Sequence, residues 1–176
     1  MSQFEFIFVL VSIILGLSLA NLFGGIARLS RKPWDQIDRV HLVFSLLTIL
    51  MVFVVWWGMY RWQGHIQFEF GTFVIIGLYT SIFYSLSAIL FPRDGSMVNF
   101  DEVRRSYYLA LILMLLLEAA QYAVGPFSPP SYYVFVWLTA FLLLSAAIWM
   151  KRRWLDGVTA AYVFVIYSGW WFVTKF

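Results

Sequence analysis

The stretch FEFIFVLVSIILGLSLANLFGGIA, residues 4–27, decides what kind of fold this chain forms. It is apolar almost throughout, with one carboxylate, Glu5, at its start and one amide, Asn21, near its end. A helix of roughly 20 apolar residues is long enough to cross the hydrocarbon core of a bilayer, which is about 30 Å thick. The stretch therefore predicts a transmembrane helix.

Five further stretches of similar length and polarity follow along the chain, separated by short segments rich in proline, glycine or basic residues. The predicted spans are 4–27, 40–60, 70–91, 106–125, 131–150 and 155–174. The predicted fold is an all-α, polytopic membrane protein. We expect a single transmembrane domain over residues 1–176, in which six helices form a bundle with short loops.

The composition agrees with a membrane protein and excludes other classes. Hydrophobic residues make up 62% of the 176 residues and charged residues 12%, and the mean hydropathy is +0.83. Soluble domains are about 45–50% apolar and about 25% charged. A soluble enzyme and a disordered chain are both excluded, since the latter is poor in apolar residues. The net charge of +3 does not suggest a nucleic-acid partner, so the expected partners are the lipid bilayer and other membrane helices.

Basic residues predict how the chain is threaded through the membrane. Cytoplasmic loops of membrane proteins carry an excess of lysine and arginine. Only Arg61 and Lys175 belong to the second and fourth loops or the tails. The first, third and fifth loops with their helix ends hold Arg28, Arg31, Lys32, Arg39, Arg93, Arg104, Arg105, Lys151, Arg152 and Arg153. The pattern predicts odd loops in the cytoplasm and both termini outside a plasma or inner membrane.

Small residues recur at every fourth position in two of the predicted helices. The first series is Ser12, Gly16, Ala20 and Gly24, and the second is Gly77, Ser81 and Ser85. Such spacing places small side chains on one helix face, where two helix backbones approach closely in a membrane. We expect both series to be helix-packing surfaces within the bundle. The alternative is an interface with a second copy or another chain.

Glu118 is the one acidic residue well inside a predicted span, with Gln121 and Tyr122 following on the same helix face. A carboxylate at membrane depth is costly, so Glu118 should face the bundle interior or a water-filled cavity. At its depth we expect a hydroxyl partner from Ser12, Tyr167 or Ser168, or a water molecule. Either Glu118 is a protonated acid that joins helices by hydrogen bonds, or it handles protons or cations.

Three other polar residues suggest a weaker alternative. Asp35, Asp38 and His41 have a spacing that would place them on one face of a helix, where they could bind a divalent metal. We expect instead that Asp38 caps the second helix and that His41 lies at the interface. The amide of Asn21 should hydrogen-bond a neighbouring helix, with contact to a substrate as the alternative.

No cofactor is expected. The chain has no cysteine for iron–sulfur or thiolate chemistry. The two histidines, His41 and His65, are predicted on opposite sides of the bilayer, and no lysine lies at mid-membrane.

These features favour a non-enzymatic helix-packing subunit or assembly partner in a membrane complex, including a homo-oligomer. Conduction paths usually have several polar lining groups, and few polar residues are predicted at mid-depth. The alternative is a small-solute or ion transporter or channel, coupled to protons through Glu118, Gln121 and Tyr122. A membrane-embedded enzyme or a protein that binds lipid or another apolar ligand is the third possibility. A cavity that reaches Glu118 would favour transport.

Overall fold

The computed structural model describes residues 2–60, 70–96, 98–124 and 132–173. In these residues the chain forms six α-helices, one short 3-10 helix and no strand. The elements are α1 (Gln3–Leu29), η1 (Trp34–Gln36), α2 (Arg39–Tyr60), α3 (Phe70–Leu90), α4 (Phe100–Val124), α5 (Tyr132–Met150) and α6 (Arg153–Val173). The predicted all-helical fold is confirmed.

Four of the six helices, α1, α2, α3 and α5, are long and apolar enough to cross a membrane. The chain therefore has the features of a membrane protein. Within the described residues, α4 and α6 are not among the helices that meet this standard. Six transmembrane helices therefore remain a prediction.

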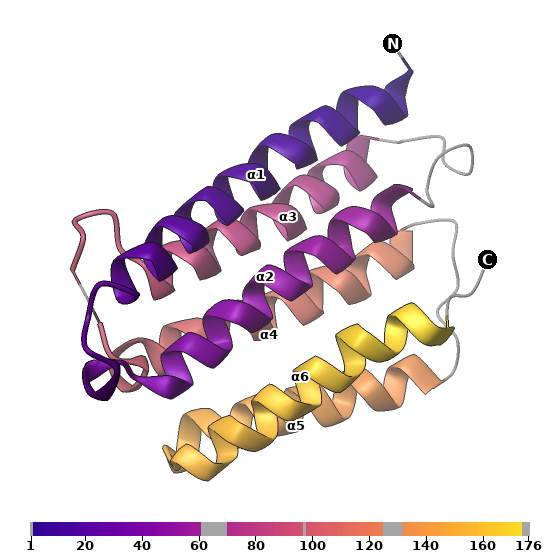
Figure 1. Cartoon of the computed structure of the whole chain (residues 1–176). Coiled ribbons are helices and arrows are strands. Elements are labelled where there is room, and N and C mark those ends of the chain that lie inside the picture. Colours follow the sequence, from indigo (N-terminus) through magenta and orange to yellow (C-terminus); the bar gives the residue numbers. More distant parts are fainter. Residues whose placement is uncertain (1, 61–69, 97, 125–131, 174–176) are drawn as a thin grey trace.

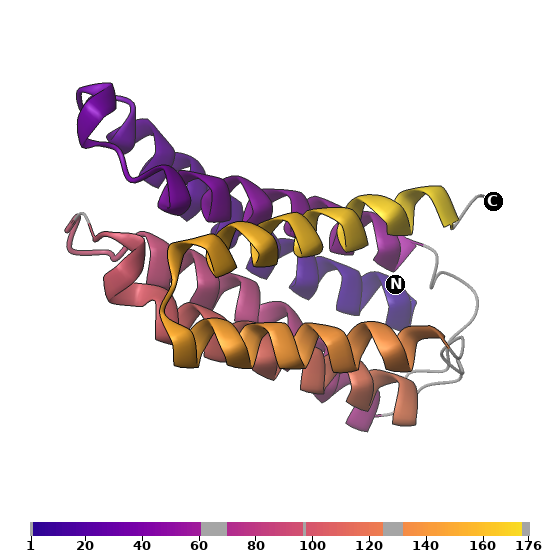
Figure 2. The same ribbon diagram turned by 90° about the horizontal axis from the view of Figure 1, so that it is seen from below.

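The helices form a closed bundle in which each helix lies beside two others. The order of neighbours around the bundle is α1, α3, α4, α5, α6, α2 and back to α1, and α2 also contacts α3. Figure 2 shows α6 beside α2 on one side and α5 on the other. Large apolar side chains fill the space between the helices, including Leu15, Phe44, Ile76 and Phe83.

Successive helices run in alternating directions (Figure 1). The connections from α1 to α2, from α3 to α4 and from α5 to α6 lie at one end, which we call the basic end because it holds the ten basic residues of the odd loops. The start of α1 and the end of α6 lie at the opposite end. Arg61, His65 and Lys175 fall outside the described residues.

Polar residues near the helix ends satisfy backbone groups. Ser2 and Glu5 form a reciprocal capping box at the start of α1, which accounts for Glu5. Asp38 accepts hydrogen bonds from the backbone N–H of Val40 (3.1 Å) and of Phe100 (2.9 Å). The predicted cap of α2 thus also caps α4, which begins six residues before the predicted span at 106.

A close approach joins α1 to the C-terminal end of α3, where Phe91 follows the last helical residue. A Cβ atom added to Gly25 would lie 2.1 Å from Cγ of Phe91, so only glycine fits there. One turn away, Nδ2 of Asn21 donates to the carbonyl oxygens of Ser87 (2.9 Å) and Phe91 (3.1 Å). The predicted bond from Asn21 to a neighbouring helix is therefore confirmed, and it satisfies a carbonyl at the end of α3.

The small-residue series do not make the expected close contacts within this chain. A Cβ atom added to Gly16 or Gly77 would meet nothing within 4 Å, and one added to Gly24 would meet only the Arg28 side chain of its own helix, at 3.9 Å. Ala20, Ser81 and Ser85 are exposed. The reason is that α1 turns a different face inward, with Val11, Leu15, Leu22 and Gly25 at its centre. Ser12 is half-buried, and its hydroxyl has no hydrogen-bond partner among the described residues.

Candidate functional site

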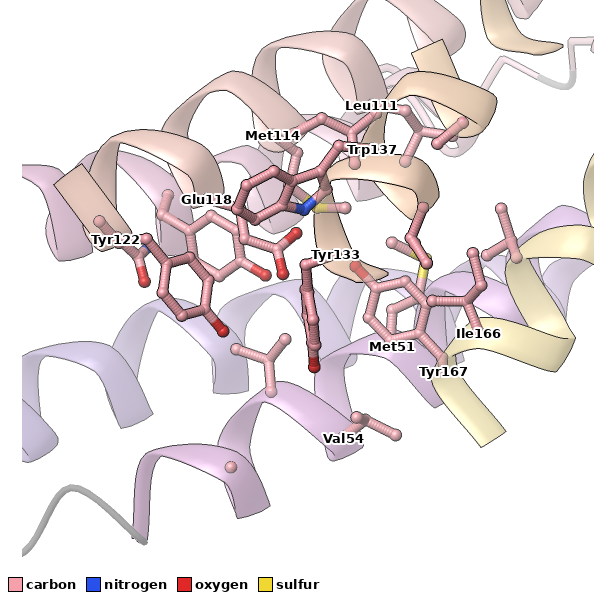
Figure 3. Close-up of a pocket in the computed structure, with 18 of the residues that line it drawn as sticks. Met51, Val54, Leu111, Met114, Glu118, Tyr122, Tyr133, Trp137, Ile166 and Tyr167 are labelled. Atoms are coloured by element: carbon pink, nitrogen blue, oxygen red, sulfur yellow. The ribbon is translucent and has the colours of Figure 1, made fainter. Parts of the chain in front are cut away.

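A cavity lies inside the bundle between α2, α3, α4, α5 and α6, and Glu118 projects into it (Figure 3). It offers about 180 Å³ to the centres of water-sized molecules. One water needs roughly 10–15 Å³ on such a measure, so the cavity has room for several waters or a small organic molecule. None of its lining residues comes from α1 among the residues described.

The cavity occupies the half of the bundle away from the basic end. At the end opposite the basic end, the cavity reaches Gly58 near the end of α2, Thr72 near the start of α3 and Tyr133 near the start of α5. Toward the basic end it stops at Leu111 on α4 and Thr159 on α6. It is therefore a one-sided cavity rather than a continuous path through the bundle.

Glu118 is the only charged residue among the described residues that line the cavity. Tyr79 on α3 and Tyr167 on α6 line the cavity together with Glu118 on α4. Figure 3 shows Tyr167 reaching into the cavity from the side opposite Glu118. Of the partners expected for Glu118, Tyr167 lies near it. Ser12 and Ser168 do not line the cavity.

The structure brings Gln121 and Tyr122 into the same cavity as Glu118. Nε2 of Gln121 is buried and has no hydrogen-bond partner within the described part of the chain. Because an unsatisfied buried donor costs about 1–3 kcal/mol, this amide would gain from a ligand or water with an acceptor group. The ring of Tyr122 packs against Tyr133 and Trp137, with centroid separations of 6.0 and 5.5 Å.

Aromatic rings form much of the cavity wall. Among the described residues, six aromatic side chains line it: Tyr79, Tyr122, Tyr133, Trp137, Tyr162 and Tyr167. Trp137 lies well inside α5, away from the interface depth that tryptophan prefers in membranes. Its place in the wall beside Tyr122 and Tyr133 gives a physical reason for this unusual depth.

A second polar group lies at the basic end of the bundle, where α4 meets α6. The carboxylate of Asp156 is fully buried and accepts from Nη2 of Arg104 at 2.5 Å and from the hydroxyl of Tyr108 at 2.7 Å. Arg104 is also buried and contacts Asp101 at 2.6 Å, and Asp101 pairs with the exposed Arg153 at 2.7 Å. Four charged residues thus form a network from the surface into the bundle.

The network has an electrostatic consequence at the surface, outside the apolar part of α4. The hydrogen bond from the Arg153 guanidinium holds the pKa of the Asp101 carboxyl group below its ordinary value, and partial burial opposes this shift more weakly. Asp101 therefore stays charged as it bridges Arg153 and Arg104.

Between this network and the cavity, packed aromatic rings close the bundle. The rings of Phe44 on α2 and Phe100 on α4 stack 4.4 Å apart, and Tyr107 and Tyr108 contact both edge-on. The Tyr107 hydroxyl shares a hydrogen bond of 2.8 Å with Thr48. These buried rings explain why the cavity stops short of the basic end.

Sequence reasoning missed the Arg104–Asp156 pair. The sequence placed Arg104 in a loop and Asp156 at the edge of a span, but both are buried. One signal was present: an acid and a base stand near the start of two predicted helices on the same side of the membrane. Asp101, which completes the network, stands in the same segment as Arg104.

The weak metal candidates do not come together. Within the described residues, no group of three or more histidine, aspartate or glutamate side chains could hold a metal ion. The predicted helical spacing fails because η1 ends before Ile37 and α2 starts only at Arg39. Asp35 is exposed, both carboxylate oxygens of Asp38 accept backbone N–H groups, and His41 is buried against the ring of Phe91. His41 lies in the first turn of α2, and its expected place at the membrane interface stays a prediction.

Comparison with known proteins adds no family to this description. No protein-family model, no curated protein and no solved structure matches the chain.

Proposed function

We propose that this protein is a membrane carrier for a small solute, with its binding site in the cavity and with Glu118 as the group that exchanges protons. The observation that carries the proposal is the cavity itself, which reaches the one charged lining residue among those described. Helices that only support one another would gain from filling such a space with apolar side chains, because voids forfeit packing energy.

The one-sided form of the cavity supports a carrier more than a channel. A channel needs a continuous path, and the packed rings of Phe44, Phe100 and Tyr107 close the basic end. A carrier instead exposes its binding site to one side at a time, with sites near the middle of the membrane. The cavity lies in the half of the bundle away from the basic end, where the site of a carrier open to that side would lie, and the Arg104–Asp156 pair lies at the other end.

The proposal includes six membrane-spanning helices, with the basic end in the cytoplasm and the start of α1 and the end of α6 outside. The ten basic residues at one end support this orientation. Reporter fusions at both termini test it, since a cytoplasmic C-terminus would contradict it.

Proton exchange at Glu118 would take place among uncharged neighbours. The titratable groups that face it are Tyr79 from α3, Tyr122 from α4, Tyr133 from α5 and Tyr167 from α6. No lysine, arginine or histidine occurs among the described lining residues. Because a lone carboxylate in an apolar cavity is costly, binding of either a proton or a cationic group would remove the same penalty.

Transport in liposomes tests the function. The purified protein is reconstituted with a pH-sensitive dye inside, and organic cations, organic anions and neutral solutes are added in turn. We expect at least one class to move protons across the membrane with the wild-type protein. The Glu118→Gln variant should lose this movement, whereas Glu102→Gln, at an exposed acid of the same helix, should keep it. Proton movement that is the same in Glu118→Gln, or absent for every class, would contradict the proposal.

A second candidate function, an assembly partner in a membrane complex, is favoured by one observation. The small-residue faces of the neighbouring helices α1 and α3 point away from the rest of the chain, with open space around Gly16 and Gly77. Such faces allow close approach of helices from another chain. Gly16→Leu should then change the oligomeric state in detergent without lowering the stability of the monomer, and an unchanged oligomeric state would remove this candidate.

A further inference from the structure

We propose that the ligand of the cavity is a small organic cation, with an alkylated ammonium group next to Glu118 and an apolar body among the aromatic rings. This inference rests on the proposed function, since it names the class of solute for the same cavity. It follows from the charge, the wall and the hydrogen-bonding groups of the cavity, each of which excludes other classes of ligand.

The charge of the lining excludes anions. The described lining residues include one acid, Glu118, and no basic side chain. An anionic ligand would lie beside the carboxylate with no arginine, lysine or histidine to compensate it. A cation instead supplies the missing opposite charge, at a place where water cannot fully screen either group.

The aromatic wall of the cavity favours a cation with an apolar body. Six aromatic rings of the described residues line the cavity. Near Glu118, the ring centroids of Tyr122, Tyr133 and Trp137 lie within 6.0 Å of one another. Aromatic faces attract cations, and tryptophan and tyrosine do so best when the site is shielded from water. Met51, Met59 and Met114 add flexible apolar surface that adapts to different shapes.

The hydrogen-bonding groups favour an alkylated ammonium over a primary one. A primary ammonium brings three N–H donors, and each needs an acceptor when buried. Glu118 is the only carboxylate among the described lining residues, so a primary ammonium would have one charged acceptor for its three donors. A tertiary or quaternary ammonium has at most one such donor and presents methyl groups to the rings.

Binding of benzyltrimethylammonium tests the inference. The radiolabelled cation is added to the protein in lipid nanodiscs, and binding to protein-free nanodiscs is subtracted. Its uncharged carbon isostere, 2,2-dimethylpropylbenzene, and benzenesulfonate serve as matched neutral and anionic probes. We expect the cation to bind at least tenfold more tightly than the isostere, and benzenesulfonate not to bind.

Variants connect the binding to the cavity. Glu118→Gln should weaken binding of the cation by about tenfold or more, and Glu118→Asp should retain part of it because the charge remains. Trp137→Leu should weaken binding about two- to tenfold, with a smaller effect for Trp137→Phe, which keeps an aromatic face. Glu102→Gln should change nothing. Elution volume and thermal stability establish that each variant is folded.

The outcomes separate this inference from the proposed function. If the neutral isostere binds as tightly as the cation and Glu118→Gln weakens neither, the inference of a cationic ligand is wrong. The proposed carrier function is then still tested separately, by solute-driven proton movement in liposomes. If anions or neutral solutes alone drive proton movement that depends on Glu118, the proposed carrier function is supported and the inference of a cationic ligand is wrong. If the cation binds through Glu118 but no solute moves protons, the cationic site stands and the carrier fails.

Discussion

Replacing Gly25 with alanine tests the close contact between α1 and Phe91, which follows the end of α3. The new Cβ atom would lie 2.1 Å from Cγ of Phe91 and 2.3 Å from each Cδ atom. Carbon atoms normally approach to about 3.5–4.0 Å, so the ring of Phe91 would have to retreat by about 1.5 Å. The ring is buried and meets the edge of His41 at a centroid distance of 5.1 Å, so its retreat disturbs a second contact.

The expected effect is a loss of stability of about 2 kcal/mol. Overpacking of a core costs about 1–3 kcal/mol, and the size of this overlap places Gly25→Ala near the upper end. Alanine recovers about 1 kcal/mol because it favours the helix over glycine. Gly16→Ala is the matched control on the same helix. Its Cβ atom meets nothing within 4 Å, so only the helix gain of about 1 kcal/mol should remain.

Reversible unfolding of the purified protein in mixed detergent and lipid micelles measures both variants. Phe91→Leu replaces the ring with a smaller side chain. The double variant Gly25→Ala/Phe91→Leu should therefore be more stable, by at least about 1 kcal/mol, than the sum of the two single losses of unfolding free energy predicts. If Gly25→Ala and Gly16→Ala are equally stable, or if Phe91→Leu brings no rescue, the packing of α1 on α3 described above is wrong.

Three further predictions concern the polar contacts between helices. Asp156→Ala should cost about 3 kcal/mol of unfolding free energy, because it leaves the buried Arg104 with only the half-exposed Asp101; Asp101→Ala, its control, should cost under about 1 kcal/mol, and equal losses would contradict a buried pair. Asn21→Leu should cost about 1 kcal/mol, because carbonyls at the end of α3 lose their donor; an unchanged unfolding free energy would mean that this bond is not formed. The lowered pKa of Asp101 means that its contribution to stability is present above pH ~4 and is lost as the pH falls through the lower folded value; Arg153→Gln should flatten this acid-side loss in a plot of stability against pH, and a curve of unchanged slope would contradict the assignment.

Much of the fold could be predicted because a membrane imposes length and polarity on each helix. The ends of α2, α3 and α5 lie within one residue of the predicted spans where both are described. The start of α4 was missed by six residues, although Asn99 and Glu102 have the spacing of a helix start and hydrogen-bond each other there. The further cap from Asp38, more than 60 positions away, has no local pattern that would reveal it.

Which helix faces meet could not be predicted from small residues alone. The spacing of Gly16, Ala20 and Gly24 is as regular as the spacing expected at an interface, yet α3 meets α1 at Gly25. The choice depends on how a large side chain, Phe91, fits the one glycine beside it. This fit is a property of two helices together and leaves no periodic signal in either sequence.

The sequence pointed to three polar residues of the candidate site, but it did not predict the wall of the cavity. The cost of a mid-membrane acid pointed directly to Glu118, and helical spacing added Gln121 and Tyr122, all three of which line the cavity. The wall from α5 and α6, including Trp137 and Tyr162, depends on the order of helices around the bundle. That order was not available from a sequence in which every helix is apolar on most sides.

Labelling of single cysteines tests the central claim, a water-accessible cavity at Glu118, most directly. The chain has no cysteine of its own, so each variant carries one reactive group. Val54→Cys places a thiol in the cavity, whereas the neighbouring Phe53→Cys places it on the outer, exposed face of α2. Because a thiol reacts as the thiolate, which needs water, a membrane-impermeant cationic methanethiosulfonate should label Val54→Cys, from the side opposite the basic end only, and leave Phe53→Cys unlabelled. No labelling of Val54→Cys from either side, or equal labelling of both variants, would contradict the cavity on which the account depends.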